Sequence, residues 1–128
     1  MTRLSEKIWF PNLENVSDDG LLAFGGDLSV QRLLLAYNSG IFPWYDERQP
    51  LLWWSPDPRM VLYPNKFKVS KSLNKTLQSD KFRITFNQNF AEVIKNCASI
   101  IRKGQPGTWI TPEMQKAYLD LHHAGHSM

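Results

Sequence analysis

The sequence has almost no cysteine: Cys97 is the single one among 128 residues. One thiol cannot form a disulfide within the chain, so nothing in the sequence requires an oxidising compartment. We therefore expect a protein of the reducing cytoplasm.

Long apolar runs are also missing. No stretch approaches the roughly 20 residues that a membrane-spanning helix needs. The N-terminus, MTRLSEKIWFPN, has neither a long apolar stretch nor a small-residue cleavage pattern. These absences exclude a secretory signal at this end and predict no membrane partner.

Self-contained catalytic motifs are absent as well. The Gly25-Gly26-Asp27 stretch lacks the length and the lysine of a phosphate-binding loop. His122 and His126 have helical spacing, but Gly125 stands between them and no carboxylate or cysteine lies close by in sequence. We therefore expect no catalytic residue, no metal and no cofactor within this chain.

Aromatic residues and prolines, in contrast, are concentrated in one place. Residues 42–59, FPWYDERQPLLWWSPDPR, hold three of the five tryptophans and four of the eight prolines. Tryptophans can stack on nucleic-acid bases, and they can equally form a hydrophobic core against proline. Composition leaves both interpretations open. The flanking pair Asp57 and Arg59 is predicted to form a structural salt bridge or turn lock, with substrate binding as the alternative.

Positive charge is concentrated next to this stretch. Residues 60–83 carry six basic side chains against Asp80 alone. A basic band beside aromatic residues is typical of a nucleic-acid site, although a solvated face has the same composition.

The pattern of apolar residues predicts an α+β fold. Residues 1–20 are expected to be mostly irregular, followed by a helix from Val30 that ends at Gly40 and an ordered loop with an extended piece at Leu51–Trp54. The second half is expected to read β-α-β-α-α. Its elements are a strand at Met60–Tyr63, a Ser70-capped helix with Leu73 and Leu77 inward, a strand at Phe82–Asn87, a helix at Phe90–Ser99, and a Thr111-capped helix to about Ala124.

Two strands leave a sheet with too few partners, because a stable sheet usually needs three or more. We therefore expect the chain to be the front part of a larger protein. The predicted division is a small N-terminal domain at 1–59 with a tryptophan- and proline-rich junction, and an incomplete second domain at 60–128.

Four stretches follow one another in a specific order: GLLAFGGDLSVQRLLLAYNSGIFPWY (20–45), LLWWSPDPRMVLYP (51–64), VSKSLNKTL (69–77) and GTWITPEMQKAYLDLHHAGHS (107–127). Together they closely resemble the leucyl/phenylalanyl-tRNA–protein transferases. The resemblance implies an aminoacyltransferase that moves leucine or phenylalanine from charged tRNA to the N-terminal arginine or lysine of a protein. That addition marks the protein for degradation by the N-degron pathway. It further implies that the second domain is GNAT-like.

The same resemblance implies roles for individual residues. Trp44, Trp109 and Tyr118 match the residues that surround the 3′-terminal adenosine and the aminoacyl ester. Lys71 and Lys75 match part of a basic cluster that contacts tRNA phosphates. Two further basic positions of that cluster are Asn74 and Gln78 here. The groups that orient the acceptor amine are implied to lie beyond Met128.

Trp53 and Trp54 are adjacent in an extended stretch, so their side chains are expected to point to opposite faces. We expect them to pack the junction between the two predicted domains, while Trp44 faces the tRNA end. Two alternatives to the transferase remain. One is a non-enzymatic tRNA- or RNA-binding module, and the other is a structural fragment that pairs with itself through an exposed sheet edge.

Overall fold

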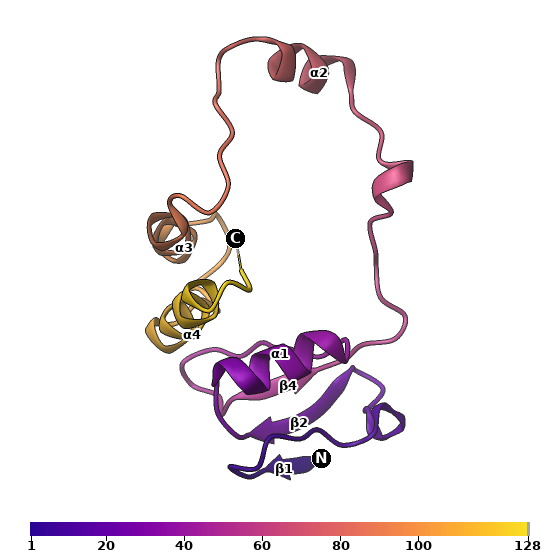
Figure 1. Cartoon of the computed structure of the whole chain (residues 1–128). Helices are drawn as coiled ribbons and strands as arrows, with labels where there is room; N and C mark the ends of the chain where they lie inside the picture. Colours follow the sequence, from indigo (N-terminus) through magenta and orange to yellow (C-terminus); the bar gives the residue numbers. More distant parts are fainter. Residues whose placement is uncertain (128) are drawn as a thin grey trace.

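A four-stranded sheet forms the base of the N-terminal half (Figure 1). The computed structural model describes residues 1–127. The strand order is β1-β2-β4-β3, with β1 parallel to β2 and the other neighbours antiparallel. The strands are β1 Thr2–Leu4, β2 Leu21–Gly25, β3 Phe42–Pro43 and β4 Leu52–Trp54.

The expectation that residues 1–20 are mostly irregular missed β1. This three-residue strand has no pattern of its own and exists only because it pairs with β2, about twenty residues later in the chain. Pro43 is compatible with β3 because β3 is an edge strand, where a missing backbone N–H costs no ladder hydrogen bond. The extended piece predicted at 51–54 is confirmed as β4.

Helix α1, Val30–Asn38, lies across this sheet (Figure 1). Its beginning is confirmed at Val30, and the hydroxyl of the preceding Ser29 caps it by accepting a hydrogen bond from the backbone N–H of Arg32 at 3.3 Å. Its end is confirmed at Gly40, which adopts φ +71°. The face that carries Leu33 and Ala36 is buried against the sheet.

Arg32 is the unusual residue of this helix because its side chain is fully buried. Its Nη2 donates to the carbonyl oxygens of Ser5 at 2.7 Å and Lys7 at 3.2 Å, and its Nη1 donates to that of Trp9 at 3.4 Å. It also forms an ion pair with Asp27 at 3.3 Å. One guanidinium thus attaches the segment after β1 to α1.

Gly26, shortly before α1, makes room for this side chain. Gly26 adopts φ +77°, and a Cβ placed there would lie 2.9 Å from Cζ of Arg32. No other residue fits this position without displacing the guanidinium. The GGD stretch therefore serves packing in this structure.

Trp53 is the largest fully buried side chain among the described residues. Its indole Nε1 donates to the carbonyl oxygen of Gly25 at 2.9 Å, and Phe10 meets its ring edge-on with centroids 4.9 Å apart. Trp54, the next residue, is half-buried and bonds instead to the backbone of Trp44. Trp53 belongs to a core that the sheet shares with α1 and with a helix from the second half of the chain.

That helix is α4, Pro112–His123, which packs against α1 through three buried residues, Met114, Ala117 and Leu121. Thr111 caps it as predicted, its hydroxyl accepting from the N–H of Met114 at 3.2 Å. Helix α3, Phe90–Ser99, has the predicted bounds and packs on α4. Helix α2, Lys71–Gln78, begins after the predicted cap Ser70.

The two predicted strands of the second half are wrong. Residues Met60–Tyr63 and Phe82–Asn87 form no strand, and all residues from 57 to 89 are exposed. Leu73 and Leu77, predicted to point inward, are exposed on α2. A strand is stable only beside another strand, and Figure 1 shows this part of the chain as an open excursion away from the sheet. The α+β class is confirmed, but β-α-β-α-α is realised only in its helices.

None of the helices within residues 1–127 combines the length and the apolar character that a membrane crossing requires.

Candidate functional site

A cavity of about 400 Å³ opens where the end of α1, strand β3 and the chain before α4 meet. This volume lies within the range of sites for small molecules. Six side chains that line it are Tyr37, Phe42, Pro43, Trp44, Arg59 and Trp109. Most of them are aromatic, so the cavity suits a flat ring.

Trp44 presents an exposed ring on a fixed backbone. The backbone N–H of Trp44 donates to the carbonyl oxygen of Leu52 at 3.1 Å, and the backbone carbonyl of Trp44 accepts from the indole Nε1 of Trp54 at 2.7 Å. The Trp54 ring packs edge-on against the Trp44 ring, with centroids 5.8 Å apart. The Trp44 side chain is nevertheless 52% exposed, which leaves ring surface free to stack on a ligand.

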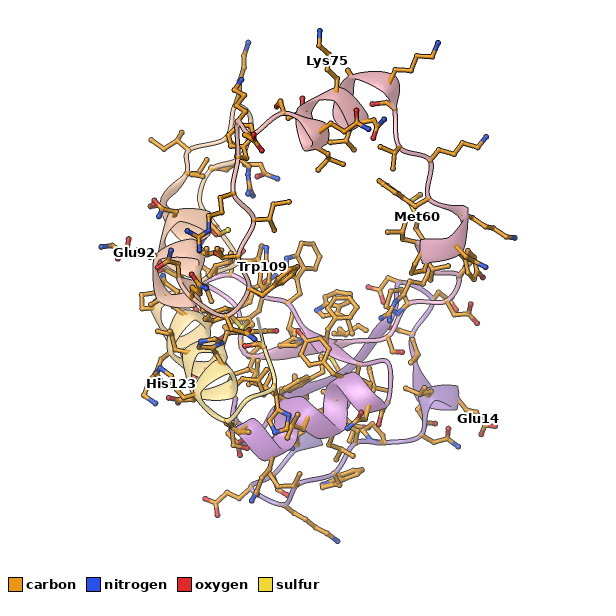
Figure 2. All side chains as sticks on the ribbon, turned by 45° about the horizontal axis from the view of Figure 1, so that its top comes forward. Glu14, Met60, Lys75, Glu92, Trp109 and His123 are labelled. Carbon is orange, nitrogen blue, oxygen red and sulfur yellow. The ribbon has the colours of Figure 1, made fainter. Side chains whose placement is uncertain are left out.

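Trp109 reaches the cavity from the other half of the chain. It stands two residues before the cap of α4, and its side chain lies toward the middle of the molecule (Figure 2). It is 40% exposed. The next residue, Ile110, is fixed to α4, because the side-chain amide of Gln115 donates to its carbonyl oxygen at 3.3 Å. Two predicted site residues, 65 positions apart in sequence, thus share one cavity.

Tyr118 does not line the cavity itself. Its hydroxyl is hydrogen-bonded to the hydroxyl of Tyr37, and the two rings meet edge-on with centroids 6.4 Å apart. Burial, together with the bond to Tyr37, raises the pKa of Tyr118, so this phenol stays protonated. Tyr118 thus reaches the site only through its bond to Tyr37.

Sequence reasoning missed Tyr37. Its position in the apolar pattern of α1 indicated a core residue, whereas it is about half exposed and lines the cavity. The single available signal was its hydroxyl, which core phenylalanine or leucine would lack.

Arg59 also lines the cavity. Its Nη2 donates to the carbonyl oxygen of Gly40 at 3.0 Å, and its guanidinium carbon lies 5.0 Å from the ring centroid of Phe42. The predicted ion pair with Asp57 is wrong, since residues 1–127 contain no such contact. Arg59 does act as a turn lock, but through a backbone carbonyl and an aromatic face.

Tyr45 connects the aromatic loop to α4. Its hydroxyl donates to Oε2 of Glu113 at 3.0 Å, and burial with the carboxylate beside it raises the pKa of Tyr45 to about 12. This bond holds the loop of Trp44 against the helix that follows Trp109.

We expect Tyr45→Phe to lower the free energy of unfolding by about 1 kcal/mol, the usual worth of one such hydrogen bond. Urea titration followed by circular dichroism measures this change. Tyr63→Phe is the matched control and should change nothing, because Tyr63 is exposed and its hydroxyl has no hydrogen-bond partner within residues 1–127. Equal stability of Tyr45→Phe and the parent chain would show that the hydrogen bond from Tyr45 to Glu113 does not hold the loop of Trp44 against α4.

Lys71 and Lys75 are not brought to the cavity. Both lie on α2, at the far end of the open excursion, and Lys75 points away from Trp109 in Figure 2. They are exposed and lie one turn apart, with Asn74 beside them. In this structure they form a solvated basic face.

His122 and Cys97 have structural surroundings, whereas His123 and His126 are exposed. His122 stacks on Phe90 with ring centroids 4.6 Å apart, and its Nδ1 lies 2.5 Å from the carbonyl oxygen of Ser127. Cys97 is a half-buried free thiol. Across residues 1–127, no group of three or more histidine, cysteine, aspartate or glutamate side chains is arranged to hold a metal ion.

Comparison with known proteins gives the same family for both halves. A family profile described as leucyl/phenylalanyl-tRNA protein transferase matches residues 61–128. A second profile, described as the N-terminal domain of that protein, matches residues 26–57.

Three curated relatives carry the name leucyl/phenylalanyl-tRNA--protein transferase. The protein from Christiangramia forsetii is 56% identical over 116 residues, which are 91% of this chain and 55% of the relative. Those from Flavobacterium johnsoniae and Lawsonia intracellularis are 51% and 52% identical, over 98% and 96% of this chain and 59% and 54% of their own lengths. The chain thus spans a little more than half the length of the curated relatives it matches. With both halves matched in order, the chain belongs to the leucyl/phenylalanyl-tRNA protein transferase family.

Proposed function

We propose that this chain forms the part of an aminoacyl-tRNA–protein transferase that receives the 3′ end of charged tRNA. In the reaction, leucine or phenylalanine leaves the tRNA ester and forms a peptide bond with the N-terminal arginine or lysine of an acceptor protein, which is thereby marked for degradation in the cytoplasm. The observation that carries the proposal is the cavity where Trp44 and Trp109 converge.

The reaction mainly requires that the protein place the ester and the acceptor amine in the right relative position. The donor is already an activated ester, so no ATP is consumed. The nucleophile is an α-amino group with an ordinary pKa of about 7.7–8.0, which leaves a useful neutral fraction at pH 7. Holding the ester in one position converts the encounter into an oriented reaction, worth several kcal/mol of the barrier. Aromatic rings on fixed backbone, such as Trp44, suit this task.

Tyr37 and Tyr118 fit the same role. The Tyr37 hydroxyl, at the wall of the cavity and hydrogen-bonded to Tyr118 behind it, offers hydrogen-bonding positions to ribose or to the aminoacyl group. Burial and the hydrogen bond to Tyr37 raise the pKa of Tyr118, which favours the protonated hydroxyl as a hydrogen-bonding group.

For the second half of the chain we propose the opening of a GNAT-like acyltransferase domain. Its two apolar segments, Met60–Tyr63 and Phe82–Asn87, are exposed and unpaired in residues 1–127. In a chain of the relatives' length, additional strands would pair with them, and Leu73 and Leu77 of α2 would then be covered.

The test uses an adenosine that carries phenylalanine through a 3′ amide in place of the ester. We expect the chain to bind this compound with quenching of tryptophan fluorescence, and to prefer it over adenosine. We expect little or no transfer of labelled phenylalanine from charged tRNA to an Arg-initiated peptide. Absence of binding would contradict the proposed tRNA-end site, and robust transfer would show that these 128 residues suffice for the reaction.

A non-enzymatic RNA-binding module is the second candidate, because Lys71 and Lys75 form an exposed basic face away from the cavity. It predicts salt-sensitive tRNA binding that the double variant Lys71→Ala/Lys75→Ala weakens. Loss of two phosphate contacts should reduce the slope of log K against log salt by roughly 1.5.

Filter binding of uncharged tRNA at several salt concentrations measures this slope. Lys66→Ala/Lys68→Ala is the matched control, since it removes the same charge from the same excursion but outside α2. An unchanged slope in the α2 variant would remove Lys71 and Lys75 from the tRNA interface.

A further inference from the structure

A second cavity, of about 590 Å³, adjoins the first. The two share Gly40 and Arg59 in their linings, so they meet at these residues. The second differs sharply in chemistry, because polar and acidic side chains replace the aromatic rings. Its lining includes Ser17, Asp18, Ser39, Ser55 and Asp57.

Arg59 is the single cation of residues 1–127 that lines both spaces. Its guanidinium is oriented by Gly40 on one side and by the Phe42 ring on the other. No carboxylate in the described part of the chain forms an ion pair with it. One of its five N–H donors is used by Gly40, and a planar guanidinium with free donors is suited to a phosphate group.

The acidic residues restrict where an anion can lie. Asp18 and Asp57 are exposed and line only the second cavity. They disfavour a phosphate inside it, but a carboxylate accepts well from an amino group, as from N4 of cytosine. The favourable place for a phosphate is therefore the boundary, at Arg59.

We propose that the second cavity binds the nucleotide that precedes the terminal adenosine of tRNA, with Arg59 bound to the phosphate between them. This assignment rests on the proposed function, since it requires the adenosine in the first cavity. The preceding nucleotide of a tRNA is a cytidine, whose N4 amino group meets the carboxylates of Asp18 and Asp57. Arg59 is then a positioning residue: it fixes the spacing between the two nucleotides and so the depth of the adenosine.

Two ligands separate this proposal from the proposed function. One is the 3′-phenylalanylamino adenosine described above, and the other is the same compound extended by a 5′ cytidine through a natural phosphodiester. We expect the dinucleotide to bind the parent chain at least about 10-fold more tightly, the effect of one charge-assisted phosphate contact. Arg59→Gln should lose this gain, so that it binds the dinucleotide no more tightly than it binds the mononucleoside, and Arg59→Lys should keep part of the gain. Arg48→Gln, on an exposed arginine that lines neither cavity, is the matched control.

The base is tested with a uridine in place of the cytidine. Uracil presents a carbonyl oxygen where cytosine has its amino group, so we expect several-fold weaker binding to the parent chain. Asp57→Asn, whose amide can both donate and accept, should reduce this preference.

Equal affinity for mononucleoside and dinucleotide would overturn the second site and leave the proposed function intact. A parallel loss of affinity for both ligands in Arg59→Gln would also overturn it, because Arg59 would then act on the first cavity. Failure of the parent chain to bind either ligand would overturn both proposals. Thermal melts of each variant establish that a lost affinity is not a lost fold.

Discussion

Trp44→Ala is expected to weaken binding of the 3′-phenylalanylamino adenosine by about 10-fold or more, with little loss of stability. Stacking of a base on an aromatic side chain contributes about 1–3 kcal/mol, and each 1.4 kcal/mol is a tenfold change in affinity. The ring is 52% exposed, so its removal leaves only a small gap in the protein. Trp109→Ala should act similarly, and the double variant should bind below detection if both rings face one base.

Calorimetric titration measures the affinity, and thermal melting measures the stability of the same variants. Trp54→Ala is the control. Trp54 lies beside Trp44 but is half-buried, and its indole nitrogen holds the Trp44 backbone through the 2.7 Å hydrogen bond to the Trp44 carbonyl oxygen. We expect this variant to lose mainly stability. The reverse pattern, with Trp44→Ala unfolding early and Trp54→Ala losing affinity at normal stability, would contradict the assignment of the exposed ring to the ligand.

Arg32→Met is expected to lower the free energy of unfolding by about 3 kcal/mol, one of the largest effects available to a single substitution here. Methionine fills much of the space but donates no hydrogen bond. Three carbonyl oxygens, those of Ser5, Lys7 and Trp9, lose their donor at once. A fully buried polar group left unsatisfied costs about 1–3 kcal/mol, and water can replace part of the lost bonding here because Ser5 and Lys7 are exposed residues. The segment after β1 should detach, which chemical denaturation and hydrogen exchange of residues 2–10 would detect.

Asp27→Asn removes the ion pair with Arg32 but keeps the hydrogen bonds from Arg32 to the backbone carbonyls, so it distinguishes their two contributions to stability. Partial burial opposes ionisation of Asp27, but hydrogen bonds from Ser29 and Arg32 together hold the pKa of its carboxyl below the ordinary 3.8. A lowered pKa in the folded state means stability that is present above pH 3.8 and is lost as the pH falls through the folded value. The Asp27→Asn variant should therefore show a flatter acid limb of the stability curve, with a smaller loss at neutral pH than Arg32→Met. A loss at pH 7 equal to that of Arg32→Met would contradict the dominance of the carbonyl contacts.

The candidate site shows how sequence and tertiary structure divide the information. Trp44 and Trp109 were singled out by the motifs that contain them, and the structure brings both to one cavity. Tyr37 escaped because its spacing in α1 is that of a core residue. Arg59 was expected to pair with its neighbour Asp57, whereas its partners are Gly40 and Phe42, which lie 17 or more positions earlier. A local sequence pattern does not predict contacts between segments that are distant in the chain.

By itself the sequence determined the helices and their approximate ends, since a cap such as Ser70 or Thr111 and a following apolar stripe act within a few residues. It determined the family as well, through ordered motifs. Among the strands the sequence indicated only the extended piece that became β4, and the tertiary structure decided the others. β1 exists because β2 lies beside it and pairs with it. Met60–Tyr63 forms no strand because no other strand lies beside it within residues 1–127. The physical reason is that a helix completes its backbone hydrogen bonds within its own segment, whereas a strand completes them only with a partner brought near by the rest of the fold.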